Sequence, residues 1–181
     1  MGGTGSGAGI TMEITKEATT KTTESAPFLS SVMQIEPQWI DYNGHLNMAY
    51  YNVMFDRAID ELWLILGIGP DYKKARGNST FTAECHVRYL REVHLGDPLQ
   101  VAITLLAADD KRLHLFEELR HAREGWLSAT SETMTLHVDM GPRKTAPFPA
   151  DVRATIERIA KSHASAPRPE GVGRSISMPR R

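Results

Sequence analysis

The sequence predicts an α+β domain in which one long helix packs against a single antiparallel sheet. Apolar residues recur at helical spacing from Met48 to Leu66, which predicts a helix about 28 Å long at 1.5 Å per residue. Further along the chain, between residues 81 and 138, strand-like runs follow one another and are separated by short polar turns. One helix followed by successive antiparallel strands is typical of a sheet with one face covered by that helix.

The segment before the helix is predicted to form the first strand. Ser31–Ile40 has a strand-like pattern, with Pro37 at an edge or bulge position because proline donates no backbone hydrogen bond. A polar turn, DYNGHLN, then leads into the helix. Asn47 is placed to cap the helix N-terminus, and Gly67 is placed to end the helix in the left-handed conformation.

The elements after the helix are four strands and one short helix. The first of these strands, Phe81–Tyr89, alternates apolar and polar residues with a period of two. Reversals at Asp109-Asp110-Lys111 and at Glu124-Gly125 separate the later strands. The remaining three strands and the final helix are predicted over Leu99–Leu106, Arg112–Arg120, Trp126–Val138 and Asp151–Lys161.

Composition excludes several classes of protein. Lys and Arg number 21 against 22 Asp and Glu, so no basic excess exists to bind nucleic acid. One cysteine, Cys85, allows no internal disulfide and no multi-cysteine zinc site, and its place in an apolar alternation predicts a core position. The longest apolar stretch, Leu62–Ile68, is too short to cross a bilayer. Without a basic region followed by an apolar run at the N-terminus, we expect a cytoplasmic protein.

The sequence predicts one folded domain between two terminal tails. Residues 1–27, rich in Gly, Thr and Ser, show no hydrophobic period and predict a disordered N-terminal tail. Residues 162–181 mix Pro, Gly, Ser and Arg and predict a flexible C-terminal tail. The folded domain is therefore expected over residues 28–161.

The stretch from Trp39 to Tyr51 carries the most chemistry, because it runs from a strand into a helix N-terminus. Unpaired N–H groups there carry about half a positive charge and attract anions and developing oxyanions. Asp41 could act as a nucleophile or base on a carbonyl held by those amides, and Gly44 would let a ligand approach the backbone. Spacing alone favours a structural role, with Asp41 in a common turn and Asn47 as a cap.

The string D-Y-N-G-H-L-N-x-x-x-Y, Asp41–Tyr51, resembles the entry motif of the hot-dog-fold acyl-CoA thioesterases of the 4-hydroxybenzoyl-CoA thioesterase group. The predicted order of strand, helix and four strands is also that of this fold. Further runs resemble the betainyl-CoA thioesterases, which occur beside or fused to L-carnitine dehydrogenase: Trp39–His45, Phe55–Ala58, Lys111–Phe116, Leu136–Asp139, Pro147–Ala150 and Gly173–Arg174. Where that subgroup favours His-Met-Asn, this chain has His45-Leu46-Asn47.

The resemblance implies a catalytic role for the turn. Asp41 would be the nucleophile or the base for water, and the amide near Met48 would polarise the thioester carbonyl. The residues that would shape the catalytic pocket beside them are Asn43, Gly44, His45 and Asn47. The resemblance also implies a homodimer or homotetramer with the site between subunits, where a partner strand supplies a second wall. The candidates for that wall share one face of the predicted strand: Thr82, Glu84 and His86.

The implied reaction is hydrolysis of a short acyl-CoA, with betainyl-CoA giving glycine betaine and CoA. No cofactor is implied beyond the CoA of the substrate. The alternatives are a thioesterase for an aromatic or medium-chain acyl-CoA, and a module that binds acyl-CoA without turnover. Trp39, Tyr42 and Tyr50, close to Asp41, could form a cage for a trimethylammonium group, with a cation–π contact worth about 2 kcal/mol. Glu84 could add a negative charge to it.

Other polar residues have simpler interpretations. Asp56, Asp60 and Glu61 form a rival carboxylate set, but they lie off the apolar stripe and are expected on a solvated helix face. No histidine pair has the HExxH spacing, so no metal site is predicted, and His114 and His137 are expected to bond along strand faces. The cations available for CoA phosphates are Arg88, Arg91, Lys111, Arg112, Arg143 and Lys144.

Overall fold

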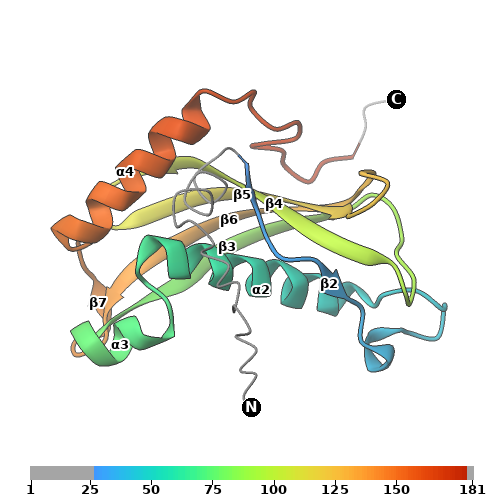
Figure 1. The fold of residues 1–181 in the computed structure, drawn as a ribbon, viewed down its shortest axis with the longest axis horizontal. Helices are drawn as coiled ribbons and strands as arrows, with labels where there is room; N and C mark the ends of the chain where they lie inside the picture. Colours follow the sequence, from blue (N-terminus) through green and yellow to red (C-terminus); the bar gives the residue numbers. More distant parts are fainter. Residues whose placement is uncertain (1–26, 179–181) are drawn as a thin grey trace, which may run out of the picture.

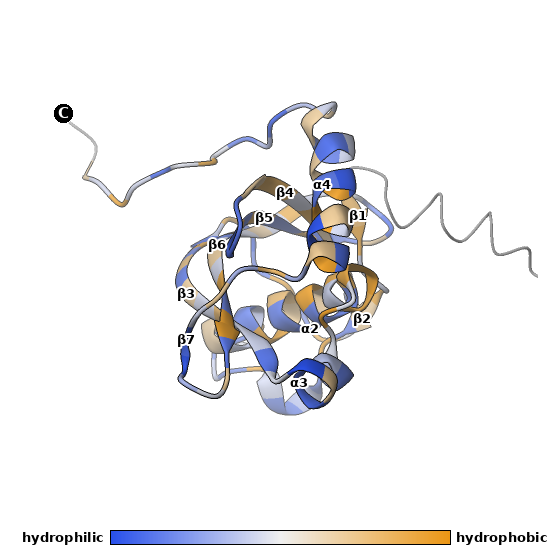
Figure 2. Ribbon diagram, turned by 90° about the vertical axis from the view of Figure 1, so that its left-hand side faces the viewer, coloured by the Kyte–Doolittle hydropathy of each residue, from blue (hydrophilic) through white to orange (hydrophobic). Residues whose placement is uncertain are grey.

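The computed structural model describes residues 27–178, so the predicted N-terminal tail lies outside the described residues except for Pro27. One sheet and one long helix make up most of this part (Figure 1). Figure 2 shows the sheet curving around helix α2, with α4 beside β4. The predicted α+β layout is confirmed.

Helix α2 (Met48–Leu66) has the predicted bounds. The side chain of Asn47 accepts a hydrogen bond from the Ala49 amide at 3.0 Å, and Gly67 ends the helix at φ 74°. One stripe of the helix is buried against the sheet: Tyr51, Met54, Phe55, Ala58, Ile59, Leu62, Trp63 and Leu66. This burial fixes the position of the helix N-terminus relative to the sheet.

Replacing Asn47 by alanine is expected to lower the free energy of unfolding by about 1 kcal/mol, because the Ala49 amide loses its cap. Chemical denaturation of both proteins measures the difference. Asn47→Ser keeps a cap acceptor and should match the wild type within a few tenths of a kcal/mol. Equal stability of the alanine variant and the wild type would contradict a capping role.

The sheet is antiparallel, in the order β1-β4-β5-β6-β3. Its long strands are β3 (Asn78–Tyr89), β4 (Pro98–Ala108), β5 (Arg112–His121) and β6 (Leu127–Asp139). Three two-residue strands extend it, with β1 (Phe28–Leu29) and β2 (Met33–Gln34) on β4 and β7 (Lys144–Thr145) on β6. All four predicted later strands are present: β3, β4 and β5 are slightly longer than predicted, and β6 is shifted by one residue. Strand β3 lies at one edge of the sheet.

The predicted strand over Ser31–Ile40 is wrong. Only β2 is extended there, and a 3-10 helix, η1 (Pro37–Trp39), follows it. Pro37 has no N–H for a ladder and its fixed φ suits the first position of a helical turn, so the strand ends before it. Ile40 makes only an isolated bridge to Leu46.

Two further helices complete the described part of the chain. Helix α3 (Pro70–Arg76) was not predicted, although Pro70 at its first turn and Gly77 at φ 68° after its end are ordinary helix signals. Helix α4 (Ala150–Ala164) extends past the predicted domain boundary at Lys161 and packs on β4, where His163 Nδ1 accepts from the Leu105 amide at 2.8 Å. No helix within residues 27–178 has the length and apolar character that a bilayer span requires.

Candidate active site

Asp41 lies in a tight turn that its own backbone closes. The Gly44 amide donates to the Asp41 carbonyl, and the Asp41 amide donates to the His45 carbonyl, both at 3.0 Å. The Asn43 amide donates to Asp41 Oδ1 at 2.8 Å, and Gly44 has φ 83°, a conformation that favours glycine. Asp41 therefore has the turn role that spacing favours. Its Oδ2 accepts no hydrogen bond from the described residues and is available to a reactant.

The Asp41 pocket is a cavity of about 350 Å³ between this turn, the start of α2 and the loop after β3. Its lining comes from these three segments: Asp41, His45, Leu46, Met48, Tyr51, Tyr89, Leu90, Arg91 and Glu92. Met48 is the first residue of α2, so its amide has no partner within the helix and carries the positive end of the dipole. The Asp41 carboxylate and the first residue of a long helix thus line one cavity.

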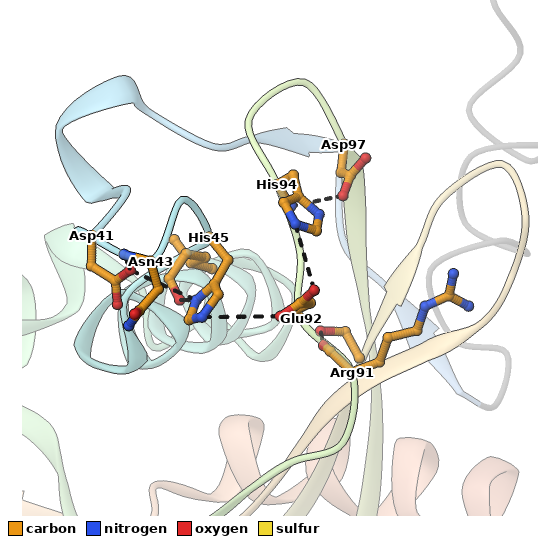
Figure 3. Close-up of polar contacts among 9 residues, drawn as sticks. Asp41, Asn43, His45, Arg91, Glu92, His94 and Asp97 are labelled. Atoms are coloured by element: carbon orange, nitrogen blue, oxygen red, sulfur yellow. Dashed lines mark hydrogen bonds and ion pairs between the residues drawn. The ribbon is translucent and has the colours of Figure 1, made fainter.

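The loop from Leu90 to Asp97 places a second carboxylate in this pocket (Figure 3). His45 lies between two acids, with Nδ1 3.9 Å from Asp41 Oδ1 and Nε2 4.0 Å from Glu92 Oε2. Glu92 in turn lies 3.7 Å from His94 Nε2. The Leu46 amide donates to the Val93 carbonyl at 2.9 Å, which ties this loop to the segment that follows the Asp41 turn.

The structure brings together part of the predicted catalytic set. Asp41, His45 and Met48 line the pocket, and Gly44 shapes the turn behind it. Asn43 contributes its backbone to the turn and Asn47 caps the helix, and neither lines the pocket. Sequence reasoning assigned no site role to five lining residues: Leu46, Tyr51, Tyr89, Leu90 and Glu92. The two tyrosines were interpreted as packing residues on a helix and a strand, and Glu92 lies in a loop without periodicity.

The predicted aromatic cage does not form in this chain. Trp39 is buried, stacks on Tyr50 at 5.3 Å between ring centroids, and has the Arg57 guanidinium 4.7 Å from its ring. Tyr42 is 97% exposed, and none of the three predicted rings lines the Asp41 pocket. The helical turn at Pro37–Trp39 directs the tryptophan into the core, which the strand predicted there did not anticipate.

The predicted shared face of Thr82, Glu84 and His86 is also wrong. A β-bulge between Thr82 and Glu84 inserts one residue, so side chains after it point to the opposite face. Thr82 and Cys85 line a cavity against α2, while Glu84 and His86 line one on the outer face with Gly173. Cys85 is exposed rather than in the core, because β3 is an edge strand.

The rival carboxylates do not form one site. Glu61 accepts hydrogen bonds from the amide and the hydroxyl of Ser31, which ties the N-terminal segment to α2. Asp56 and Asp60 are exposed on the helix, as predicted, and burial together with the Asp56 charge raises the pKa of Asp60. Neither lines the Asp41 pocket.

The strand-face hydrogen bond predicted for His114 is confirmed, whereas His137 bonds to α3 and to the segment after β7. His137 is buried, with Nε2 2.9 Å from the Tyr72 hydroxyl and Nδ1 2.7 Å from the Ala146 carbonyl oxygen. His114 Nε2 lies 2.8 Å from Glu132 Oε1. Of the six cations proposed for CoA phosphates, Arg91 borders the Asp41 pocket, and its guanidinium lies 3.9 Å from the ring centre of Trp126.

Comparison with known proteins identifies the family. The model of the thioesterase-like superfamily matches residues 35–156. The betainyl-CoA thioesterase of Pseudomonas aeruginosa is 43% identical over 143 residues, covering 79% of this chain and 90% of that protein. The L-carnitine dehydrogenase/betainyl-CoA thioesterase of Rhizobium meliloti is 37% identical over 156 residues, covering 86% of this chain and 31% of that protein.

A solved structure of similar fold supports the same assignment. A Staphylococcus aureus protein in complex with CoA superposes with a TM-score of 0.79 at 28% identity, covering 85% of this chain and 98% of that one. The predicted hot-dog fold and acyl-CoA thioesterase activity are confirmed. The chain belongs to the thioesterase-like superfamily.

Proposed function

We propose that this chain hydrolyses betainyl-CoA to glycine betaine and CoA, and that Asp41 is the catalytic carboxylate. The proposal depends on one observation: Asp41 and Met48, the first residue of α2, line the same pocket. The Pseudomonas aeruginosa relative, named for this substrate, aligns over most of both chains and supports the choice of acyl group.

The chemistry follows from that geometry. The thioester carbonyl oxygen accepts a hydrogen bond from the Met48 amide, which draws electrons from the carbonyl carbon and stabilises the oxyanion. Asp41 either attacks that carbon itself or takes a proton from an attacking water. The carbon–sulfur bond breaks, CoA leaves as the thiolate, and one water is consumed to give the free acid.

We also propose that the site is completed in a homodimer or homotetramer. Five consecutive residues of the edge strand β3, Phe81 to Cys85, are exposed in the single chain. An unpaired strand edge of this length is normally covered, and pairing it with a second copy removes both edges at once. Pairing of this kind would place a partner strand near the end of β3 that borders the Asp41 pocket.

The cellular setting is part of the proposal. Because the Rhizobium meliloti relative bears the names of both activities on one chain, we propose an L-carnitine dehydrogenase as the functional neighbour. A cytoplasmic location, predicted from the sequence, fits that neighbour.

A panel of thioesters tests the substrate. We expect kcat/KM for betainyl-CoA to exceed the values for acetyl-, benzoyl- and octanoyl-CoA by at least about tenfold, measured as release of free thiol, because tenfold is only about 1.4 kcal/mol of selective binding. Hydrolysis of betainyl-CoA no faster than acetyl-CoA would reject the proposed acyl group. Binding of acyl-CoA without thiol release would instead favour a non-catalytic module.

A further inference from the structure

A second cavity, of about 330 Å³, lies between α2 and the inner face of the sheet. Residues from α2, β3, β5 and β6 line it, among them Asn52, Phe55, Asp56, Cys85, Glu117 and Thr133. The thioesterase chemistry described above uses none of these side chains. We call this cavity the Glu117 pocket.

Glu117 is the unusual group in this cavity. Its residue is 0% exposed, and the Thr133 hydroxyl donates to Oε1 at 3.0 Å, but Oε2 has no hydrogen-bond partner among the described residues. Burial raises the pKa of Glu117 to about 8, and the nearby Asp56 charge acts in the same direction. A buried carboxyl oxygen without a hydrogen-bond partner is unfavourable, so it points to a ligand that supplies the missing contact.

The lining indicates the charge and shape of that ligand. Within the described residues the Glu117 pocket has two acids, Glu117 and Asp56, and no lysine or arginine. Val53, Phe55 and Ile59 supply apolar and aromatic wall. A quaternary ammonium group has no N–H to donate, so it needs a negative charge and apolar contact rather than several acceptors. No described group of three His, Cys, Asp or Glu side chains is placed to hold a metal ion.

The Glu117 pocket lies next to the Asp41 pocket along the same interface. The Tyr89 hydroxyl donates to the Met48 carbonyl at 3.2 Å beside the Asp41 pocket, and Cys85 Sγ lies 3.9 Å from Asn52 Oδ1 at the Glu117 pocket. Met48 and Asn52 are four residues apart on α2, about 6 Å along the helix axis. The Asn52 end of the Glu117 pocket is therefore about one helical turn from the Met48 amide.

We infer that the Glu117 pocket binds the cationic end of the substrate acyl group, with Glu117 as its counter-ion and specificity determinant. This inference rests on the proposed function, since it names the part of the pocket that selects a quaternary ammonium. Binding of the cation converts Glu117 to the carboxylate and releases its proton. Burial of Glu117 strengthens the Coulomb attraction between its carboxylate and a bound cation.

Two thioesters of equal shape test the inference. Betainyl-CoA and 3,3-dimethylbutyryl-CoA differ only in having a positive nitrogen or a neutral carbon at the branch point. We expect wild type to prefer betainyl-CoA in kcat/KM and Glu117→Gln to reduce that preference at least tenfold. Asp60→Asn, a change of an acid one turn from Asp56 that does not line the Glu117 pocket, is the matched control and should keep the preference.

The outcomes separate the two proposals. If wild type hydrolyses neither ester, the proposed function fails. If wild type prefers betainyl-CoA and Glu117→Gln keeps that preference, the proposed function stands and the role of Glu117 is overturned.

A measurement on the wild type keeps the test decisive should Glu117→Gln fold poorly. Calorimetric titration with glycine betaine at pH 7, in two buffers of different ionisation heat, should show release of close to one proton. The other titratable groups at the Glu117 pocket are Asp56 on α2 and Cys85 on β3. The release should therefore persist in Cys85→Ser, and binding without proton release would overturn the inference.

Discussion

The Asp41→Asn variant is expected to hydrolyse its thioester substrate about 10²- to 10⁴-fold more slowly than wild type, the usual contribution of a positioned acid–base group. Asparagine keeps an oxygen that can accept from the Asn43 amide, so the turn should fold unchanged. It has no negative charge with which to attack the carbonyl or to take a proton. Initial rates of thiol release at saturating and limiting substrate measure the loss in kcat and kcat/KM.

The matched control for that variant is Asp71→Asn, because Asp71 is a solvent-exposed acid on α3 that does not line the Asp41 pocket. It should keep the wild-type rate. Undiminished turnover by Asp41→Asn would remove Asp41 from the mechanism. Single turnover in heavy-oxygen water separates its two possible roles, since direct attack places the label first in the Asp41 carboxylate and water attack places it in the product.

Glu117→Gln is expected to remove a large part of the pH dependence of stability. The native pKa of Glu117 is about 8, against 4.5 as the ordinary value, so between these pH values the native state binds more protons than the unfolded state. The wild-type free energy of unfolding should therefore fall as pH rises through this window, by up to about 1.4 kcal/mol per pH unit from this group. Glutamine is neutral throughout and contributes no such slope.

Chemical denaturation of both proteins at pH 5.5, 7 and 8.5 measures this effect. The difference in unfolding free energy, variant minus wild type, should increase with pH by a few kcal/mol over this range. Other groups titrate in both proteins and cancel in the difference. Parallel pH profiles for the two proteins would show that Glu117 is already ionised in the native state.

The residues of α2 and its two flanking residues were enough to predict the central helix. Helix α2 was predicted to the residue because the stripe of apolar residues, the Asn47 cap and the Gly67 terminus all indicate the same bounds. The segment before it was predicted poorly, since its apolar residues suit either a strand or a turn and only Pro37 signalled the break. Helix α3 has a proline at its start and a glycine after its end, but it is too short to show a periodic pattern of apolar residues. It was therefore not predicted.

The candidate site was predictable where it is local in sequence and not where it depends on packing. Asp41, His45 and Met48 lie within eight residues, but Glu92 reaches them only through the fastening of its loop to Leu46. Glu117 did leave a signal in the sequence. Leu115, Glu117 and Leu119 are two residues apart on β5, so their side chains point to the same face. Since both leucines are buried, the alternation places the Glu117 carboxyl on the inward face as well.

The bulge at Thr82 and Glu84 also governs how relatives of this chain should be aligned. Before the bulge, the even-numbered Thr80 and Thr82 line cavities beside α2, and after it the odd-numbered Cys85 does. An alignment that ignores this bulge would therefore assign the side chains on one side of it to the wrong face of the sheet. Gain or loss of a single amino acid at this point would exchange the β3 side chains that line the Glu117 pocket with those that line the cavity on the outer face of the sheet. A single substitution changes only one of these side chains.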